Sequence, residues 1–414
     1  MKARGEIRPP GDKSISHRAV LLSTLTEGVM DICGLLRSQD VLSSCQAVQS
    51  LGIELNSQAE LVTIRGKTPR EPKKVLDAGN SGTTARLLCG VFASMDGVST
   101  LTGDDSLVKR PMARVIRPLE RMGALFLARS GSFLPLSVKG SRLKGITHEM
   151  EISSAQVKSA LIIAALKAEG TTSIREPWPS RDHTERMLAY LGARLEKKGT
   201  AIEITGPQTI QAGEITVPGD PSSAAFPAVW AASTPGSEIR IRDVCLNPTR
   251  TAFVSVLARM RAQIVMENTR ETCGEPVGDL VVTGGDLLGT TIGGPEIPAL
   301  IDEIPILAVA AARAHGTTVI QGASELRLKE SDRITALTRG FSSLGAEIQE
   351  LDDGMVIEGP LKLRAGTVQT MGDHRIAMTF AILSRIFDIE VELDDAACVA
   401  ISYPGFFPSM ESLA

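Results

Sequence analysis

Apolar and polar residues follow one recurring arrangement along the chain, in which an amphipathic helical stretch ends at Leu or Met and two short strand patterns come next. The junctions are Leu51-Gly52, Met122-Gly123, Leu191-Gly192, Met260-Arg261 and Leu344-Gly345. Glycine suits this position because it adopts the left-handed conformation that terminates a helix. After the third junction, Ile202 and Ile204 alternate with polar residues just beyond Lys198-Gly199, a pattern typical of a hairpin.

The steps between the junctions are 71, 69, 69 and 84 residues, and 414 residues divided by six is 69, so about six units of this kind would fill the chain. Helix–glycine–strand junctions occur in any α/β protein, and the regular spacing is what favours an internal repeat. A chain of this length exceeds one ordinary core, which predicts two domains. We expect their boundary near Val217-Pro218-Gly219, where proline and glycine interrupt regular structure. Asp220 and Pro221 are typical of an N-cap and a first helical residue.

Several predicted helices begin with small or polar residues beside a basic one. These starts are Gly11–Arg18, Gly79–Arg86, Lys109–Pro111 and Ser153–Gln156. The free N–H groups and the dipole of a helix N-terminus favour an anion. In the first start, Lys13 and Arg18 bracket a serine that we expect to cap the helix. Taken singly, each pattern is more often a simple capped helix, and only the recurrence favours an anion site.

The second half adds acidic residues at three further helix starts, Asp302–Pro305, Lys329–Arg333 and Asp373–Arg375. Carboxylates near a helix N-terminus also complement the dipole without any further role. A solvated charged turn would equally explain residues 329–333, and His374 would fit a buried, hydrogen-bonded histidine.

Composition and charge exclude several classes of function. A net charge of -4 argues against nucleic acid or an anionic membrane as partner. The six cysteines form no CxxC pair and no metal-ligand spacing with histidine, so we expect reduced thiols. The first ten residues lack a signal-peptide pattern and no stretch is apolar enough to span a membrane, which predicts a cytoplasmic protein. P-loop, dinucleotide, HExxH and Gly-x-Ser-x-Gly motifs are absent.

Six motifs in order give the chain a resemblance to the 5-enolpyruvylshikimate-3-phosphate (EPSP) synthase family, from about residue 5 to the C-terminus. They are Gly11–Arg18, Gly79–Arg86, Lys109–Met112, Ser154–Ala160, Lys329–Arg333 and Asp373–Arg375. The resemblance implies a two-domain, inside-out α/β prism of the enolpyruvyl transferase type, with three helix-plus-strand repeats per domain. One lobe would comprise residues 11–217, and the other residues 1–10 plus 218–414. The first lobe would mainly bind shikimate 3-phosphate, and the second would complete the phosphoenolpyruvate site as the lobes close.

The implied reaction transfers the enolpyruvyl group of phosphoenolpyruvate to the 5-hydroxyl of shikimate 3-phosphate and releases phosphate, a step of chorismate and aromatic amino acid biosynthesis. It runs by addition and elimination, in a monomer that uses no metal and no organic cofactor. Two anions side by side repel each other strongly once water leaves. Clustered Lys and Arg offset that repulsion, and Arg forks suit carboxylate and phosphate groups.

The resemblance also assigns roles to individual residues. Asp302 would take the proton of the attacking hydroxyl, and Glu330 would shuttle a proton at the methylene carbon with help from Lys13. The residues implied for shikimate 3-phosphate are Lys13, Ser14, Arg18, Ser154, Ala155, Gln156, Asp302 and Lys329. Those implied for phosphoenolpyruvate are Lys13, Gly82, Arg110, Gln156, Arg333 and Arg375.

Three positions depart from the best-known members: Leu87 replaces a proline, Ala155 a serine and Ile401 a lysine. These departures occur in a branch linked to tolerance of the inhibitor glyphosate, although Gly82 leaves room for it. Three alternatives stay open. The related transferase acting on UDP-N-acetylglucosamine usually has Lys-Asn where this chain has Lys13-Ser14, and a loop cysteine that residues 104–112 lack. The others are a non-catalytic phosphometabolite-binding protein and an RNA terminal phosphate cyclase.

Overall fold

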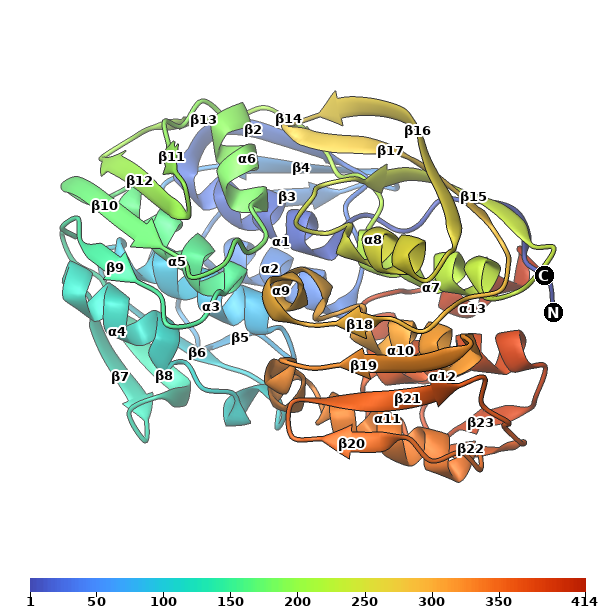
Figure 1. Cartoon of the computed structure of the whole chain (residues 1–414). Helices are drawn as coiled ribbons and strands as arrows, with labels where there is room; N and C mark the ends of the chain where they lie inside the picture. The colour runs from blue at the N-terminus through green and yellow to red at the C-terminus, as the bar shows by residue number, and fades with distance from the viewer. The chain divides into compact units, whose positions relative to one another are not determined.

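The computed structural model describes residues 1–414 and divides them into two compact units. The first unit contains Gly11–Val217 and Thr272–Glu275, and the second contains Met1–Pro10, Pro218–Glu271 and Pro276–Ala414. The polypeptide therefore begins in the second unit, passes to the first at residue 11 and returns at residue 218. Each unit has three sheets and its own set of helices (Figure 1).

The first unit carries six α-helices, α1 (Lys13–Leu22), α2 (Gln39–Ser50), α3 (Gly82–Ala93), α4 (Ala113–Met122), α5 (Ala155–Ala165) and α6 (His183–Tyr190). Its first sheet has the order β13-β2-β4-β3, with β14 also pairing β2. The others have the orders β5-β6-β8-β7 and β11-β12-β10-β9. Their strands are β2 (Thr26–Cys33), β3 (Glu54–Ser57), β4 (Leu61–Gly66), β5 (Leu76–Asp77), β6 (Val98–Thr102), β7 (Leu125–Arg129), β8 (Phe133–Lys139), β9 (Thr147–Glu149), β10 (Gly170–Arg175), β11 (Glu196–Lys198), β12 (Ala201–Gly206), β13 (Ile210–Gln211) and β14 (Glu214–Thr216).

The second unit carries the helices α7 (Pro221–Ala232), α8 (Ala252–Arg259), α9 (Ile297–Leu300), α10 (Ile304–Arg313), α11 (Arg333–Ser343), α12 (His374–Phe387) and α13 (Phe406–Glu411). Its sheets have the orders β1-β15-β17-β16, β18-β19-β21-β20 and β22-β23. Their strands are β1 (Arg4–Ile7), β15 (Glu238–Cys245), β16 (Gln263–Thr272), β17 (Glu275–Thr283), β18 (Thr291–Ile292), β19 (Gly316–Ile320), β20 (Gln349–Leu351), β21 (Gly354–Gly359), β22 (Gly366–Val368) and β23 (Val391–Leu393). The chain's first strand, β1, lies parallel to β15.

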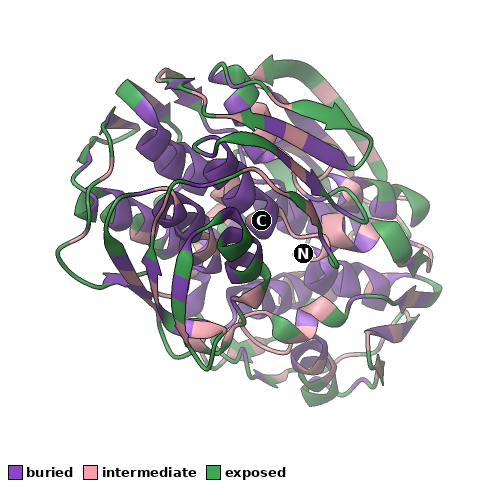
Figure 2. Ribbon diagram, turned by 90° about the vertical axis from the view of Figure 1, so that its left-hand side faces the viewer, coloured by how far each residue is buried: buried purple, intermediate pink, exposed green.

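Helices form the interior of each unit and sheets form its outside. Every residue of α7 is buried, and α5 buries each of its residues from Val157 to Ala165. A helix that is apolar on all sides belongs in a core. The strands instead alternate, as in β4, where Val62 and Ile64 are buried and Arg65 is exposed. Figure 2 shows the same contrast, with helical ribbons mostly purple and green along outer strands and loops. This confirms the inside-out α/β architecture.

The predicted helix-to-hairpin junctions are present. Gly52, Gly123, Gly192 and Gly345 have φ angles of 82°, 119°, 89° and 86°, and Arg261 has 70° at the equivalent place. Each junction leads from a helix into an antiparallel pair: β3-β4, β7-β8, β11-β12, β16-β17 and β20-β21. The sixth sheet is smaller, because β22 and β23 pair in parallel without a hairpin. Asp220 caps α7 as predicted, its Oδ1 accepting from the Ser222 amide at 2.8 Å.

No helix of the structure combines the length and the apolar character that crossing a membrane requires. The longest, α12, has 14 residues.

Candidate active site

The N-terminus of α1 presents Lys13 and Ser14. Its cap is Asp12, whose Oδ1 accepts from the Ile15 amide at 2.8 Å. The expectation that a serine between Lys13 and Arg18 caps this helix was therefore wrong: Asp12 already satisfies the free amide, and Ser14 and Ser16 lie inside the helix. Lys13 forms an ion pair with Asp40, which lies in the first turn of α2.

Arg18, one turn along α1, is buried and joins three helices. Its Nε donates to Thr184 Oγ1 at 2.7 Å and its Nη2 donates to Ser159 Oγ at 2.8 Å. Nη1 donates to the Ser14 carbonyl at 2.9 Å. The guanidinium thus holds the first turn of α1 against α5 and α6.

The N-termini of α3 and α5 meet through Gln156. Ser81 caps α3 by accepting from the Thr84 amide at 3.1 Å, and Ser154 caps α5 by accepting from Val157 at 3.5 Å. Gln156 Nε2 donates to Thr83 Oγ1, and its Oε1 accepts from Arg86 Nη1, both at 2.9 Å.

Those contacts bring Gln156 to the first turn of the helix that contains Gly82. The signal for Arg86 was present in the sequence as the basic residue of the glycine motif, although no site role was assigned to it.

Arg110 approaches the same glycine loop from a different element. The helix expected to begin at Lys109–Pro111 begins later, at Ala113, and Arg110 lies in the extended link before it. Its Nη2 donates to Asn80 Oδ1 at 2.9 Å and to Ser106 Oγ at 3.1 Å. Gly82 lies close by, since a Cβ built on it would be 3.6 Å from Arg110 Nη1.

Sequence reasoning missed Arg181. This residue precedes α6, and its Nη1 donates to Ser14 Oγ at 3.4 Å. A basic residue before a helix was available as a signal, because Arg181-Asp182 repeats the pattern of the other helix starts. We call the predicted residues of this unit the first half-site: Lys13, Ser14, Arg18, Gly82, Arg110, Ser154, Ala155 and Gln156.

In the second unit the predicted residues gather around Arg333, whose side chain is only 1% exposed. Nε donates to Asp373 Oδ2 at 2.8 Å, Nη2 to Glu330 Oε2 at 2.6 Å and Nη1 to Asp302 Oδ1 at 3.4 Å. Burial by itself would lower the pKa of Arg333, but the three carboxylates outweigh it and raise that pKa. Residues 329–333 are therefore not merely the solvated turn that the sequence also allowed.

Asp302 and Lys329 complete this group, with Asp302 Oδ1 lying 3.8 Å from Lys329 Nζ. The neighbouring Glu303 is fully buried and accepts from Ser222 Oγ, which anchors the start of α10. Asp302 itself keeps 17% of its side chain exposed, so it stays accessible beside a rigid support.

Asp373 links this cluster to α12. Its Oδ1 caps the helix by accepting from the Arg375 amide at 2.8 Å, while Oδ2 also accepts from Ser331 Oγ at 3.0 Å. Burial raises the pKa of Asp373, but Arg333 outweighs it and holds the pKa below its usual value. Arg375 follows in the first turn and is 7% exposed. Asp302, Lys329, Glu330, Arg333 and Arg375 form what we call the second half-site.

The three departures from the family pattern fall on ordinary structural positions. Leu87 is fully buried in α3, Ala155 is the first residue of α5, and Ile401 ends a short 3₁₀ turn with intermediate exposure.

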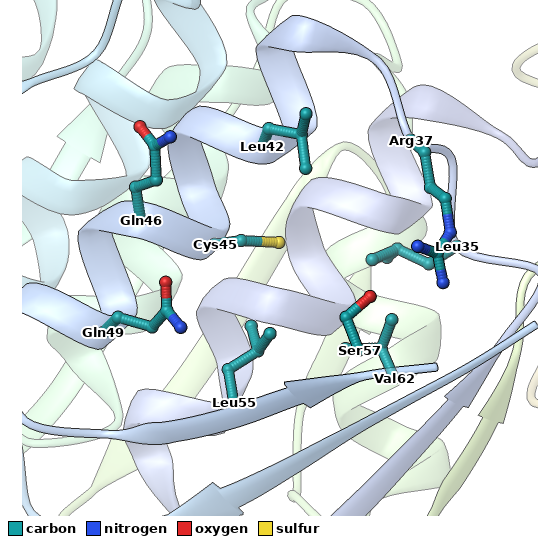
Figure 3. Close-up of a pocket in the computed structure, with 9 residues that line it drawn as sticks. All are labelled: Leu35, Arg37, Leu42, Cys45, Gln46, Gln49, Leu55, Ser57 and Val62. Carbon is teal, nitrogen blue, oxygen red and sulfur yellow. The ribbon is translucent and has the colours of Figure 1, made fainter. Parts of the chain in front are cut away.

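A cavity of about 490 Å³ lies elsewhere in the first unit, between α2 and the strands β3 and β4 (Figure 3). Leu42, Cys45 and Leu55 point into it, and burial raises the pKa of the Cys45 thiol to about 11. None of the predicted site residues lines it. The cavity is therefore separate from the first half-site.

Comparisons with known proteins agree on one family. The family described as EPSP synthase (3-phosphoshikimate 1-carboxyvinyltransferase) matches residues 1–410. The protein of that enzyme name from Desulforamulus reducens is 46% identical over 410 residues, covering 98% of this chain and 96% of the relative. The protein of the same name from an Anaeromyxobacter species (strain Fw109-5) is 48% identical over 413 residues, covering 99% of this chain and 96% of the relative.

Solved structures give the same result. EPSP synthase from Acinetobacter baumannii matches with a TM-score of 0.88 and 38% identity, covering 100% of this chain and 96% of that one. The enolpyruvyl transferase NikO from Streptomyces tendae matches with a TM-score of 0.78 at 14% identity, covering 100% and 95%, which shows a shared fold.

Proposed function

Since the chain belongs to the EPSP synthase family, we propose that it transfers the enolpyruvyl group of phosphoenolpyruvate to the 5-hydroxyl of shikimate 3-phosphate and releases phosphate. The observation that supports this most is that Asp302 and Glu330 both contact the buried guanidinium of Arg333. Two carboxylates on a common cation suit a reaction that moves one proton from a hydroxyl and another to a carbon.

Substrate binding in this proposal is divided between the half-sites. The first half-site would hold shikimate 3-phosphate through Lys13, Ser14, Arg18 and the start of α5. Lys13, Gly82, Arg110 and Gln156 would contact phosphoenolpyruvate together with Arg333 and Arg375. Two helix starts and several cations support this assignment, because exposed amide groups, helix dipoles and guanidinium forks all favour anions.

The proton steps follow from the carboxylates. In the addition, Asp302 would accept the proton of the 5-hydroxyl as its oxygen attacks the central carbon, while Glu330, assisted by Lys13, would deliver a proton to the methylene carbon. In the elimination, the resulting methyl group would lose a proton to Glu330 as the C–O bond to phosphate breaks, and the proton held by Asp302 would leave with the phosphate. Neither step changes an oxidation state, and the proposal, following the resemblance, includes no metal and no organic cofactor.

We further propose that the enzyme acts as a monomer on these small molecules in the cytoplasm, closes on binding them, and has no nucleic acid or membrane partner. All six cysteines are free thiols, which is typical of a reducing compartment.

Phosphate release tests the proposal when it is measured with phosphoenolpyruvate plus shikimate 3-phosphate and with each substrate alone. Release should require both. Asp302→Asn and Glu330→Gln should each lower kcat by about 10²–10⁴-fold, the usual contribution of a positioned acid or base, while still binding both ligands.

Glu347→Gln is the matched control, because Glu347 is an exposed carboxylate of the same unit. Turnover of UDP-N-acetylglucosamine in place of shikimate 3-phosphate would instead indicate the related transferase. Binding of both substrates without any phosphate release would indicate a non-catalytic binding protein.

A further inference from the structure

A buried chain of hydroxyl groups lies behind the first half-site and connects three helices. His17 Nδ1 of α1 lies 2.8 Å from Ser44 Oγ of α2, and Ser44 Oγ lies 2.7 Å from Thr84 Oγ1 of α3. Thr84 Oγ1 donates to Ser81 Oγ at 2.8 Å. All four residues are buried, and α1, α2 and α3 pack on one another.

The hydrogen bonds of this chain run in a single direction. Because the Thr84 hydroxyl proton goes to Ser81, Thr84 Oγ1 is free to accept, so Ser44 must donate to it. Ser44 Oγ then accepts from His17, which places the imidazole proton on Nδ1. His17 Nε2 is buried and has no hydrogen-bond partner. A nitrogen without a proton tolerates this better than an N–H group, which would leave a donor unpaired.

The surroundings keep His17 uncharged. Burial, followed by the nearby cations Lys13 and Arg18, lowers its pKa well below the usual value. An imidazolium would also bury an N–H at Nε2 without an acceptor. The neutral imidazole therefore donates a hydrogen bond from Nδ1 and does not act as a proton shuttle.

Each end of the chain meets an element of the proposed phosphoenolpyruvate site. His17 lies one turn after Lys13, and Thr84 and Ser81 form the capped first turn that contains Gly82. Ser44 lies on α2, one turn after Asp40, which pairs with Lys13. A slip of α1 against α3 would break this chain and move Lys13 relative to Gly82 at the same time.

We infer that His17 is a positioning residue, which sets Lys13 of α1 against the Gly82 turn of α3 through Ser44 and Thr84. The inference rests on the proposed function, in which Lys13 and Gly82 contact phosphoenolpyruvate. It predicts that the donor atom at the Nδ1 position matters and that the rest of the ring does not.

Three substitutions at one position separate these contributions. The amide nitrogen of His17→Asn occupies the place of Nδ1, that of His17→Gln reaches toward Nε2, and His17→Leu has no donor. We expect Asn to stay within about threefold of the wild-type KM for phosphoenolpyruvate, whereas Gln and Leu raise it about tenfold, the effect of leaving one buried group unpaired.

Val20→Ala is the matched control, because Val20 is a fully buried residue of the same helix outside the hydroxyl chain. It should lower the melting temperature without changing that KM. Ser44→Ala should reproduce most of the effect of His17→Leu, and the double variant should add little, since each removes the 2.8 Å hydrogen bond between His17 Nδ1 and Ser44 Oγ and the direct contact of Nδ1 with Thr84 Oγ1, at 3.5 Å, is weak. If His17→Leu does not fold, Ser44→Ala alone carries the kinetic test.

An NMR measurement on ¹⁵N-histidine-labelled protein is independent of activity, and only five histidines need assignment. His17 should show the neutral Nδ1–H tautomer at neutral pH. An Nε2–H tautomer, a charged ring, or a KM in His17→Gln and Ser44→Ala equal to that of Val20→Ala would overturn the inference. Loss of phosphate release in the wild type would instead count against the proposed function, while the tautomer would still test the chain.

Discussion

At the residue scale, the second half-site depends on the ion pair between Arg333 and Asp373. Asp373 is fully buried and accepts from Arg333, Ser331 and the amide that starts α12. Removing one partner of a buried ion pair costs about 3–5 kcal/mol when the other charge is left uncompensated, and the lower end of that range, about 3 kcal/mol, applies here because Glu330 and Asp302 still contact Arg333. We therefore expect Asp373→Asn to lower the free energy of unfolding by roughly that amount, measured by urea denaturation.

Asp332→Asn is the control for this change. Asp332 also caps a helix and pairs with an arginine, but its side chain is 37% exposed. Asn remains a good N-cap, and an exposed ion pair contributes about 0–1 kcal/mol, so this variant should stay close to the wild type. Equal losses in the two variants would show that the buried ion pair of Asp373 with Arg333 contributes no more to stability than the exposed pair of Asp332.

The stability contributed by Asp373 should depend on pH in a defined direction. Its folded pKa is depressed, mainly because the attraction of Arg333 outweighs burial. The contribution is therefore complete above the unfolded pKa of about 3.9 and is lost as pH falls through the lower folded value. The difference in unfolding free energy between wild type and Asp373→Asn should be constant at neutral pH and shrink as pH falls below the unfolded pKa toward the lower folded value. A difference that grows in acid would contradict this assignment.

At the scale of elements, α3 and α5 approach closely because Gly90 lacks a side chain. A Cβ at Gly90 would lie 2.2 Å from the Ala160 carbonyl oxygen of α5, a backbone atom that cannot turn away. At Gly82 of the same helix, the nearest atom to a built Cβ is Arg86 Nη1 at 2.6 Å, the end of a flexible side chain. The same substitution at the two positions should therefore have different consequences.

We expect Gly90→Ala to lower the free energy of unfolding by about 1–3 kcal/mol or more, the usual cost of overpacking. Gly82→Ala should leave stability nearly unchanged but raise the KM for phosphoenolpyruvate, because it moves Arg86 from Gln156 and fills space beside Arg110. Urea unfolding and steady-state kinetics on both variants separate the two effects. A large stability loss in Gly82→Ala would show that its first turn is as rigidly packed as the middle of α3.

At the scale of the whole molecule, the proposed function requires cations of both units to bind phosphoenolpyruvate, so neither set should suffice alone. Arg110→Ala from the first unit and Arg375→Ala from the second should each raise the KM for phosphoenolpyruvate by about 10–100-fold, the loss expected for charged hydrogen bonds. Arg117→Ala and Arg339→Ala are exposed arginine controls, one in each unit. If only one of the two variants raises the KM for phosphoenolpyruvate, the proposal of a site divided between the units is wrong. If Arg110→Ala strongly lowers the melting temperature, Arg110 has a structural role.

What the sequence determined was local. Turn glycines, cap residues and apolar periodicity act within a few residues, so the junctions, most helix starts and the α/β class could be predicted from neighbours in the chain. The cap of α1 and the start of α4 were misplaced, because Asp12 precedes the serines and caps α1, and Arg110 lies in an extended link.

What only the tertiary structure decided concerns residues distant in sequence. Contacts join residues 14 and 181, residues 86 and 156, and residues 302 and 373 with residue 333. They form because the N-termini of separate helices lie close together within each unit. The hydroxyl chain from His17 to Ser81 has the same origin, since hydrogen-bond partners 27 and 40 residues apart leave no periodic trace. Local sequence preferences determine which helices and strands form, whereas burial and charge compensation determine which helix termini lie next to one another.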